Sequence, residues 1–226
     1  MKGYVYFDIE TFNILNENTQ DISCVAIKSS DDRMHIIYNY NGEKLSKSQA
    51  AFALKYLYEN MLSGYSVVSW NGLSFDIPLL AQISGEYKLA IELAKGHYDV
   101  MFQVLCLQGY GVSLGSVAKA MKIPGKLGGL KSNEVPALWE SGQIDKVLAY
   151  VIQDLNLTAS IVDAIVQRGE IIWISSKGAE KSLILKQLNN VSECLLLPKP
   201  NIEWMDSKGR EQWNRNKFYS WFDRYL

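Results

Sequence analysis

Two carboxylates near the start of the chain, Asp8 and Glu10, are spaced so that both can bind one metal ion. They lie in or next to a segment rich in aromatic and β-branched residues, Gly3 to Ile9, which predicts a buried strand. Alternate residues of a strand project from the same face, so the two side chains reach the same cation. Close carboxylates on a buried face repel each other unless a cation compensates. The alternative interpretation is a polar strand end that binds no metal.

A tyrosine and a third aspartate, Tyr150 and Asp154, are four residues apart and therefore stack on one face of a predicted helix. The alternative for this pair is a solvated helix edge above a packed aromatic ring. Asp76 follows a predicted strand, a turn and an aromatic residue; alone, it also fits a carboxylate favoured by the dipole at a helix start. The joint occurrence of all three motifs in this order favours one shared site.

The elements that must position these residues follow an α/β order with one antiparallel edge. Further strands, rich in apolar residues, are predicted at Ile22 to Lys28, Met34 to Tyr40, Tyr65 to Trp70 and His97 to Val100. Helices, identified by caps and apolar periodicity, are predicted from Ser46 until Gly64, from Phe75 onward, at Leu114 to Met121 and at Ile144 to Gln167.

The remainder of the chain continues this order. A strand is predicted at Glu170 to Ser175 and a helix at Lys181 to Leu188. We therefore expect one domain over residues 1–226, with a core of about residues 1–170 and a C-terminal extension of about residues 171–226.

Composition limits the functions that this chain performs. Its 226 residues are 48% hydrophobic, enough to bury a full core, and the formal net charge of −1 lacks the basic excess of many nucleic-acid binders. Any contact with phosphates must be local or carried by metal ions. Three scattered cysteines and two histidines argue against a disulfide framework and a zinc finger. Without a signal peptide or a run of about 18 apolar residues, we expect a soluble cytoplasmic protein with no membrane contact.

Three short motifs resemble those of the DnaQ-like 3′→5′ exonucleases of the ribonuclease H-like superfamily. They are FDIET at residues 7–11, WNGLSFD at residues 70–76 and YVIQD at residues 150–154. A sister branch of that family places histidine five residues before the last aspartate, where this chain has Ala149. The chain thus resembles the tyrosine branch, over roughly residues 3–165, and is most similar to the proofreading domains of family B DNA polymerases and their free-standing bacterial relatives.

The resemblance implies a ribonuclease H-like fold, a mixed five-stranded sheet flanked by helices, in the order 3-2-1-4-5 with strand 2 antiparallel. It also implies a hydrolase that removes nucleoside 5′-monophosphates from the 3′ end of a single strand, with DNA favoured. The oxygen-only ligands predict a hard cation, Mg²⁺ or Mn²⁺.

By similarity, two such ions lie about 4 Å apart. Asp8 bridges both ions, Glu10 and Asp154 complete the first, and Asp76 holds the second through water. An ordinary tyrosine, with a pKa of about 10, is a poor base near neutral pH. The resemblance therefore assigns Tyr150 to orient the attacking water.

Residues near the motifs are expected to hold the terminal nucleotide. The resemblance assigns this role to Thr11, Ile14, Asn71 and Phe75, with Thr11 reaching the 3′-hydroxyl and Ile14 and Phe75 flanking the base. For Phe75 the alternative is an ordinary core aromatic. Lys126 lies in a glycine-rich loop that can approach phosphate, or is simply a solvated loop residue.

Two further features have structural interpretations. Asp99 resembles a strand-end aspartate and is expected to cap the following segment. The tail from Glu203 to Leu226 mixes aromatic and basic residues that suit stacking on bases and contact with a backbone. Its aromatics also fall at helical spacing (Phe218, Trp221, Phe222 and Tyr225), which favours a terminal helix docked on the domain.

Two other functions remain open on the sequence. One is a catalytically inactive ribonuclease H-like module that binds nucleic acid or a partner, although all four carboxylates are present. The other is a 3′→5′ exoribonuclease, since contacts to the 2′-hydroxyl do not show in a sequence. No protein partner is indicated.

Overall fold

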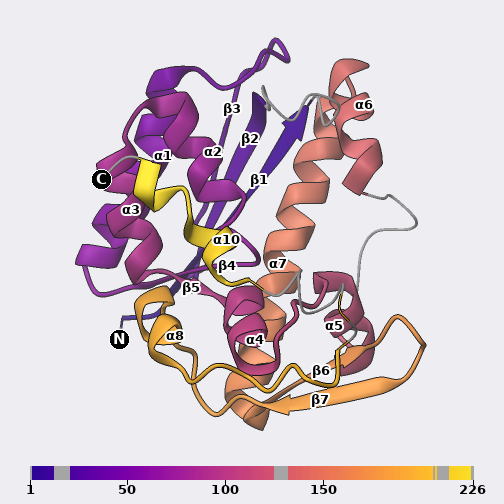
Figure 1. Cartoon of the computed structure of the whole chain (residues 1–226). Helices are drawn as coiled ribbons and strands as arrows, with labels where there is room; N and C mark the ends of the chain where they lie inside the picture. Colours follow the sequence, from indigo (N-terminus) through magenta and orange to yellow (C-terminus); the bar gives the residue numbers. More distant parts are fainter. Residues whose placement is uncertain (1, 13–20, 125–131, 206, 208–213, 225–226) are drawn as a thin grey trace.

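A five-stranded mixed sheet lies at the centre of the chain's computed structural model, which describes residues 2–12, 21–124, 132–205, 207 and 214–224 (Figure 1). Its strands are β1 (Tyr4–Phe12), β2 (Asp21–Ser29), β3 (Met34–Tyr38), β4 (Ser66–Ser69) and β5 (Tyr98–Asp99). The order is β3-β2-β1-β4-β5. Strand β2 runs antiparallel to both neighbours, and β4 and β5 extend the sheet in parallel. The α/β class, the strand order and the antiparallel β2 confirm the fold that the motifs imply.

Alternation along β1 divides the molecule into two apolar layers. In the first apolar layer, Val5, Phe7 and Ile9 pack with helices α1 (Lys47–Leu62), α2 (Asp76–Ser84) and α3 (Tyr87–Gly96). In the second apolar layer, Tyr6 packs with α5 (Leu114–Met121), α6 (Val135–Glu140) and α7 (Ile144–Arg168). In Figure 1, α1 to α3 lie on one side of the sheet and α7 lies along the other. Successive side chains of a strand point to opposite faces, so Asp8 and Glu10 share the α7 side with Tyr6.

Local capping sets several helix starts as the sequence predicts. Ser46 and Gln49 form a reciprocal capping box at the start of α1, and the Ser113 hydroxyl accepts from the backbone of Ser116 at the start of α5. Helix α2 starts at Asp76, with Pro78 in its first turn. Phe52, on α1, is 55% exposed and stacks on Tyr56.

Helix α7 is the longest helix of the described residues and meets the length and apolarity of a membrane span. Half of the most apolar 18-residue stretch of this helix is buried against the rest of the structure, which is typical of a core helix. Its buried face carries both Tyr150 and Asp154. The helix therefore brings the third motif to the face of the sheet that carries the first.

Four helices were not located by periodicity: α3, α4 (Val100–Gln108), α6, which follows a 3₁₀ turn at Ser132–Glu134, and α8 (Val191–Leu196). Each spans ten residues or fewer, and short apolar runs do not separate helix from strand by periodicity.

The helix predicted at Lys181 to Leu188 is wrong. That segment begins with strand β7 (Glu180–Ile184), which pairs antiparallel with β6 (Glu170–Ile174) in a two-stranded sheet. Leu183 and Leu185 are more buried than Ile184 between them, a period of two that fits a strand. Pairing with the predicted strand β6 decided the conformation.

The C-terminal segment docks on the first apolar layer, as its aromatic spacing favoured. After α8 (Val191–Leu196), it forms the short helix α10 (Asn216–Tyr219) and a 3₁₀ turn, η2 (Phe222–Arg224), and not one continuous helix. Trp221 and Phe222 are buried in the cluster with α1 to α3. Tyr225 lies outside the described residues.

Candidate active site

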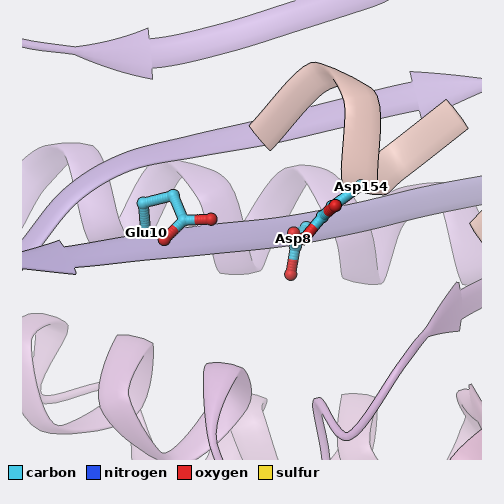
Figure 2. A group of neighbouring side chains, drawn as sticks. All are labelled: Asp8, Glu10 and Asp154. Atoms are coloured by element: carbon cyan, nitrogen blue, oxygen red, sulfur yellow. The ribbon is translucent and has the colours of Figure 1, made fainter. Parts of the chain in front are cut away.

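Three carboxylates from two elements converge on the α7 side of the sheet. Asp8 and Glu10 project from β1 and Asp154 projects toward them from α7 (Figure 2). One carboxylate oxygen from each lies within 4.8 Å of the other two. Residues 8 and 154 are far apart in the chain, so this cluster exists only because α7 packs across β1.

Asp76 reaches the same strand from α2, which lies on the other side of the sheet from α7. Its Oδ1 accepts a hydrogen bond from the backbone nitrogen of Ile9, 3.1 Å away, between Asp8 and Glu10. The side chain is buried, but its oxygens do not belong to the three-carboxylate group. The structure therefore places Asp76 beside the cluster and tethers it to β1.

Burial and mutual repulsion make the negative charges of this site costly. Burial raises the pKa of Asp8 well above its ordinary value, and the charges of Asp76, Glu10 and Asp154 raise it further. Burial, then the charge of Asp99, raises the pKa of Asp76 from 3.8 to about 7. A divalent cation would remove this repulsion and restore the ionised carboxylates.

The donor set fits a hard cation. Asp8, Glu10 and Asp154 offer only carboxylate oxygens, the ligands that Mg²⁺ and Mn²⁺ prefer. No histidine or cysteine belongs to the group found among the described residues. The structure thus contains a possible acidic metal-binding group at three of the four expected positions.

Tyr150 lies one helical turn before Asp154 on α7. Its side chain is 3% exposed and packs in the second apolar layer with Val147 and Val151. Residues four apart share a helix face, so Tyr150 and Asp154 both face the sheet. This packing fixes the ring.

The residues expected to hold a terminal nucleotide are placed less uniformly. Thr11 is buried at a bulge where the pairing of β1 with β2 shifts, directly after Glu10. Asn71 takes a left-handed backbone conformation, with φ of 73°, and its Oδ1 accepts from the Ser74 hydroxyl at 2.6 Å. Phe75 is partly buried against the first apolar layer, directly before Asp76. Ile14 and Lys126 lie outside the described residues.

Asp99 supports this region through three backbone amides. It caps α4 by accepting from Phe102 N at 3.0 Å, which confirms the expected capping role. It also accepts from Asn71 N at 3.0 Å and from Leu73 N at 2.9 Å, contacts that sequence reasoning missed. No local pattern signals them, because they join segments 26 and 28 residues apart.

A buried histidine completes the support. His97 Nδ1 donates to the Ala94 carbonyl at 2.8 Å, so its Nε2 accepts from the Ser69 hydroxyl at 3.2 Å. The Ser69 oxygen in turn accepts from Gly72 N at 3.1 Å. Burial lowers the pKa of His97, which favours the neutral ring in this chain of bonds.

Comparisons with known proteins agree with this architecture. The RNase_H superfamily model matches residues 5–166, and a sequence search of curated proteins gave no significant match. The family B DNA polymerase from the hyperthermophilic archaeon Pyrobaculum calidifontis shares the fold, with a TM-score of 0.53 and 15% identity over 74% of this chain. The aligned part is only 25% of that polymerase.

Two structures of E. coli exonuclease I align over 99% of this chain at 10% identity and a TM-score of 0.42. The alignments cover 70% and 71% of the exonuclease I chain. The two structures are complexes with a 5cy-dA13 and a dT13 oligonucleotide, respectively. At such identities a structural likeness concerns the fold alone. The matched family model spans β1 to α7, which are the elements that carry all three motifs. The chain therefore belongs to the ribonuclease H superfamily.

Proposed function

We propose that this chain is a metal-dependent 3′→5′ exonuclease of the DnaQ-like tyrosine branch, which removes nucleoside 5′-monophosphates from single-stranded nucleic acid, with DNA favoured. One observation carries the proposal: carboxylate oxygens of Asp8, Glu10 and Asp154 lie within 4.8 Å of one another. The Asp76 carboxylate, whose charge raises the pKa of Asp8, stands beside them. Four buried or half-buried acids are costly to a fold that gains no cation from them.

In this proposal the four carboxylates serve as the cation site. Asp8, Glu10 and Asp154 would hold divalent ions directly, and Asp76, tethered to the Ile9 amide, would contribute from the side of α2. Mg²⁺ or Mn²⁺, when bound, would polarise the scissile phosphate and make a hydroxide nucleophile available near neutral pH.

The remaining residues orient the reactants. The Tyr150 hydroxyl directs the attacking water toward phosphorus, since its ring is held in place between α7 and the sheet. Thr11, Asn71 and Phe75 hold the terminal nucleotide, and Ile14 is retained as a further candidate for this role. Lys126 is retained as a weaker candidate for contact with phosphate.

A cleavage assay tests the proposal. Purified protein with Mn²⁺ is offered 5′-labelled and 3′-labelled oligonucleotides, single- and double-stranded, of DNA and of RNA. We expect a descending ladder from 5′-labelled single-stranded DNA and immediate release of a labelled mononucleotide from 3′-labelled DNA. A preference for the RNA substrates would make the chain an exoribonuclease, and binding without cleavage would make it an inactive ribonuclease H-like module.

A matched pair of variants excludes a contaminating nuclease. Asp154→Asn removes one charge of the cluster with little change in size. Asp163→Asn makes the same substitution on the exposed face of the same helix. Activity should be lost in the first variant and retained in the second.

A further inference from the structure

The loop between β4 and α2, residues 70–75, carries two of the residues proposed to hold the terminal nucleotide, Asn71 and Phe75. The loop is packed tightly. A Cβ at Gly72 would clash with the Ser69 side chain and would lie 3.1 Å from Cζ of Phe7. Its conformation is therefore fixed by its surroundings.

Both peptide groups of Leu73, at the centre of this loop, are bound by side chains from distant parts of the chain. Its N–H donates to Asp99 Oδ2 at 2.9 Å, and its carbonyl accepts from Trp221 Nε1 at 2.9 Å. The Leu73 side chain is fully buried and Trp221 is 9% exposed, so water does not readily replace either bond. Asp99 and Trp221 thus hold one residue of the loop from two sides.

Trp221 is itself held by the docked C-terminal segment. Its ring packs edge-on against Phe222, with ring centroids 4.6 Å apart. Phe218, on α10, packs against Phe102 on α4 at 5.7 Å, and the amide of Phe102 is bound by Asp99. In Figure 1, α10 lies near α4, in agreement with the contact between Phe218 and Phe102.

Loss of the indole donor would leave the Leu73 carbonyl buried and without a side-chain donor, which is unfavourable. The loop would then occupy other conformations for part of the time. Apparent substrate affinity falls in proportion to the fraction of molecules in the binding-competent conformation. Saturating substrate selects that conformation again, so the rate at saturation is preserved.

We propose that Trp221 is a positioning residue: through its hydrogen bond to Leu73, and opposite Asp99, it holds the β4–α2 loop in the conformation that binds the terminal nucleotide. This inference rests on the proposed exonuclease function. It assigns the C-terminal segment to substrate binding through the loop, without direct contact with nucleic acid.

Three substitutions separate positioning from simple stability. Trp221→Phe removes the indole donor and keeps an aromatic ring. Trp204→Phe removes a similar bond, from Trp204 Nε1 to the Asn201 carbonyl at 3.0 Å, at an exposed site where the ring packs against Tyr110. Phe218→Leu weakens the docking of the C-terminal segment and keeps the bond to Leu73.

The first measurement is steady-state cleavage of a single-stranded oligonucleotide with Mn²⁺. We expect Trp221→Phe to raise KM roughly three- to tenfold, the range of one hydrogen bond, with kcat within about twofold of wild type. Trp204→Phe should match wild type. Phe218→Leu should lower the melting temperature and raise KM less than Trp221→Phe does, because it keeps the indole donor. A wild-type KM in Trp221→Phe, or a KM that rises with loss of stability in all three variants, would overturn the proposal.

The second measurement needs no activity. Hydrogen–deuterium exchange of peptides covering residues 70–75 should be faster in Trp221→Phe than in Trp204→Phe, without nucleic acid or metal. Unchanged exchange there refutes the loop contact even if the chain proves inactive as a nuclease. If Trp221→Phe does not fold, Asp99→Asn tests the opposite side of Leu73, with the same expected rise in KM and in exchange.

Discussion

The Oδ1 atom of Asp76 accepts a hydrogen bond from the backbone nitrogen of Ile9 at 3.1 Å, which fastens the start of α2 to β1 between the two acidic residues of the first motif. This bond needs an oxygen acceptor but no charge. The charge itself is costly, because burial and the neighbouring Asp99 raise the pKa of Asp76 to about 7. The two roles of Asp76 can therefore be separated by substitution.

Asp76→Asn should keep the bond to Ile9 and remove the charge. We expect the melting temperature of the chelated protein to rise, because repulsion within the cluster falls. Cleavage should fall at least about 100-fold, the scale for loss of one positioned electrostatic group. Calorimetry in EDTA and cleavage in Mn²⁺ measure the two effects. A less stable chelated variant would show that the Asp76 charge itself stabilises the fold.

Divalent cations should stabilise the wild-type protein. Binding to the folded state alone contributes about 2.7 kcal/mol when the free ion is at 100 times its dissociation constant. We expect a higher melting temperature in millimolar Mn²⁺ than in EDTA, and a smaller difference in Asp154→Asn. Asp163→Asn, on the exposed side of α7, should respond as wild type does. Identical melting curves with and without Mn²⁺ would contradict the metal site.

The stability of the chelated protein should depend on pH in a direction set by Asp76 and Asp8. The folded-state pKa of Asp76 is raised from 3.8 to about 7, so its contribution is fully present below pH 3.8 and is lost as pH rises through about 7. The pKa of Asp8 is raised as well and acts in the same direction. Urea unfolding in EDTA should therefore show a lower free energy of unfolding at pH 8 than at pH 5.

The variant Asp76→Asn serves as the reference for this pH dependence, because the raised pKa of Asp8 contributes in the same direction. Its free energy of unfolding should fall less between pH 5 and pH 8 than that of wild type. Equal slopes for the two proteins would mean that Asp76 has an ordinary pKa.

Asp8→Ala should abolish cleavage and preserve binding. In the proposed site Asp8, which lies near the charges of Asp76, Glu10 and Asp154, would bind ions, whereas Thr11, Asn71 and Phe75 would hold the nucleotide. We expect no product with Mn²⁺ and a nearly unchanged dissociation constant for single-stranded DNA in Ca²⁺, measured by fluorescence anisotropy. Residual cleavage at more than about one per cent of the wild-type rate would remove Asp8 from the mechanism.

Tyr150→Phe tests the hydroxyl alone. The ring should still pack against the sheet, so the melting temperature should change little. Loss of one orienting hydrogen bond in the transition state should reduce kcat by about 10²- to 10³-fold, with a nearly constant KM. Rapid-quench kinetics with Mg²⁺ near neutral pH measure this step. A wild-type rate would leave Tyr150 as a packed aromatic on the helix that carries Asp154.

The sequence by itself determined the local elements around the motifs and the chemistry of the candidate site. Alternation along β1 placed Asp8 and Glu10 on one face, the spacing of four placed Tyr150 with Asp154, and capping residues set the starts of α1 and α5. These features depend on residues within a few positions of one another. Backbone geometry and side-chain size are sufficient to express them.

Only the tertiary structure decided which distant groups meet. The motifs together led us to expect Asp154 beside Asp8, but it is the packing of α7 on β1 that brings them together. The bond from Ile9 to Asp76 and the holding of Leu73 by Asp99 and Trp221 were not expected, and they join segments up to 148 residues apart. The β6–β7 hairpin was likewise decided by strand pairing, because the short segment after Glu180 fits helix and strand alike. Such contacts arise from packing the layers and satisfying buried polar groups, which no local pattern of residues encodes.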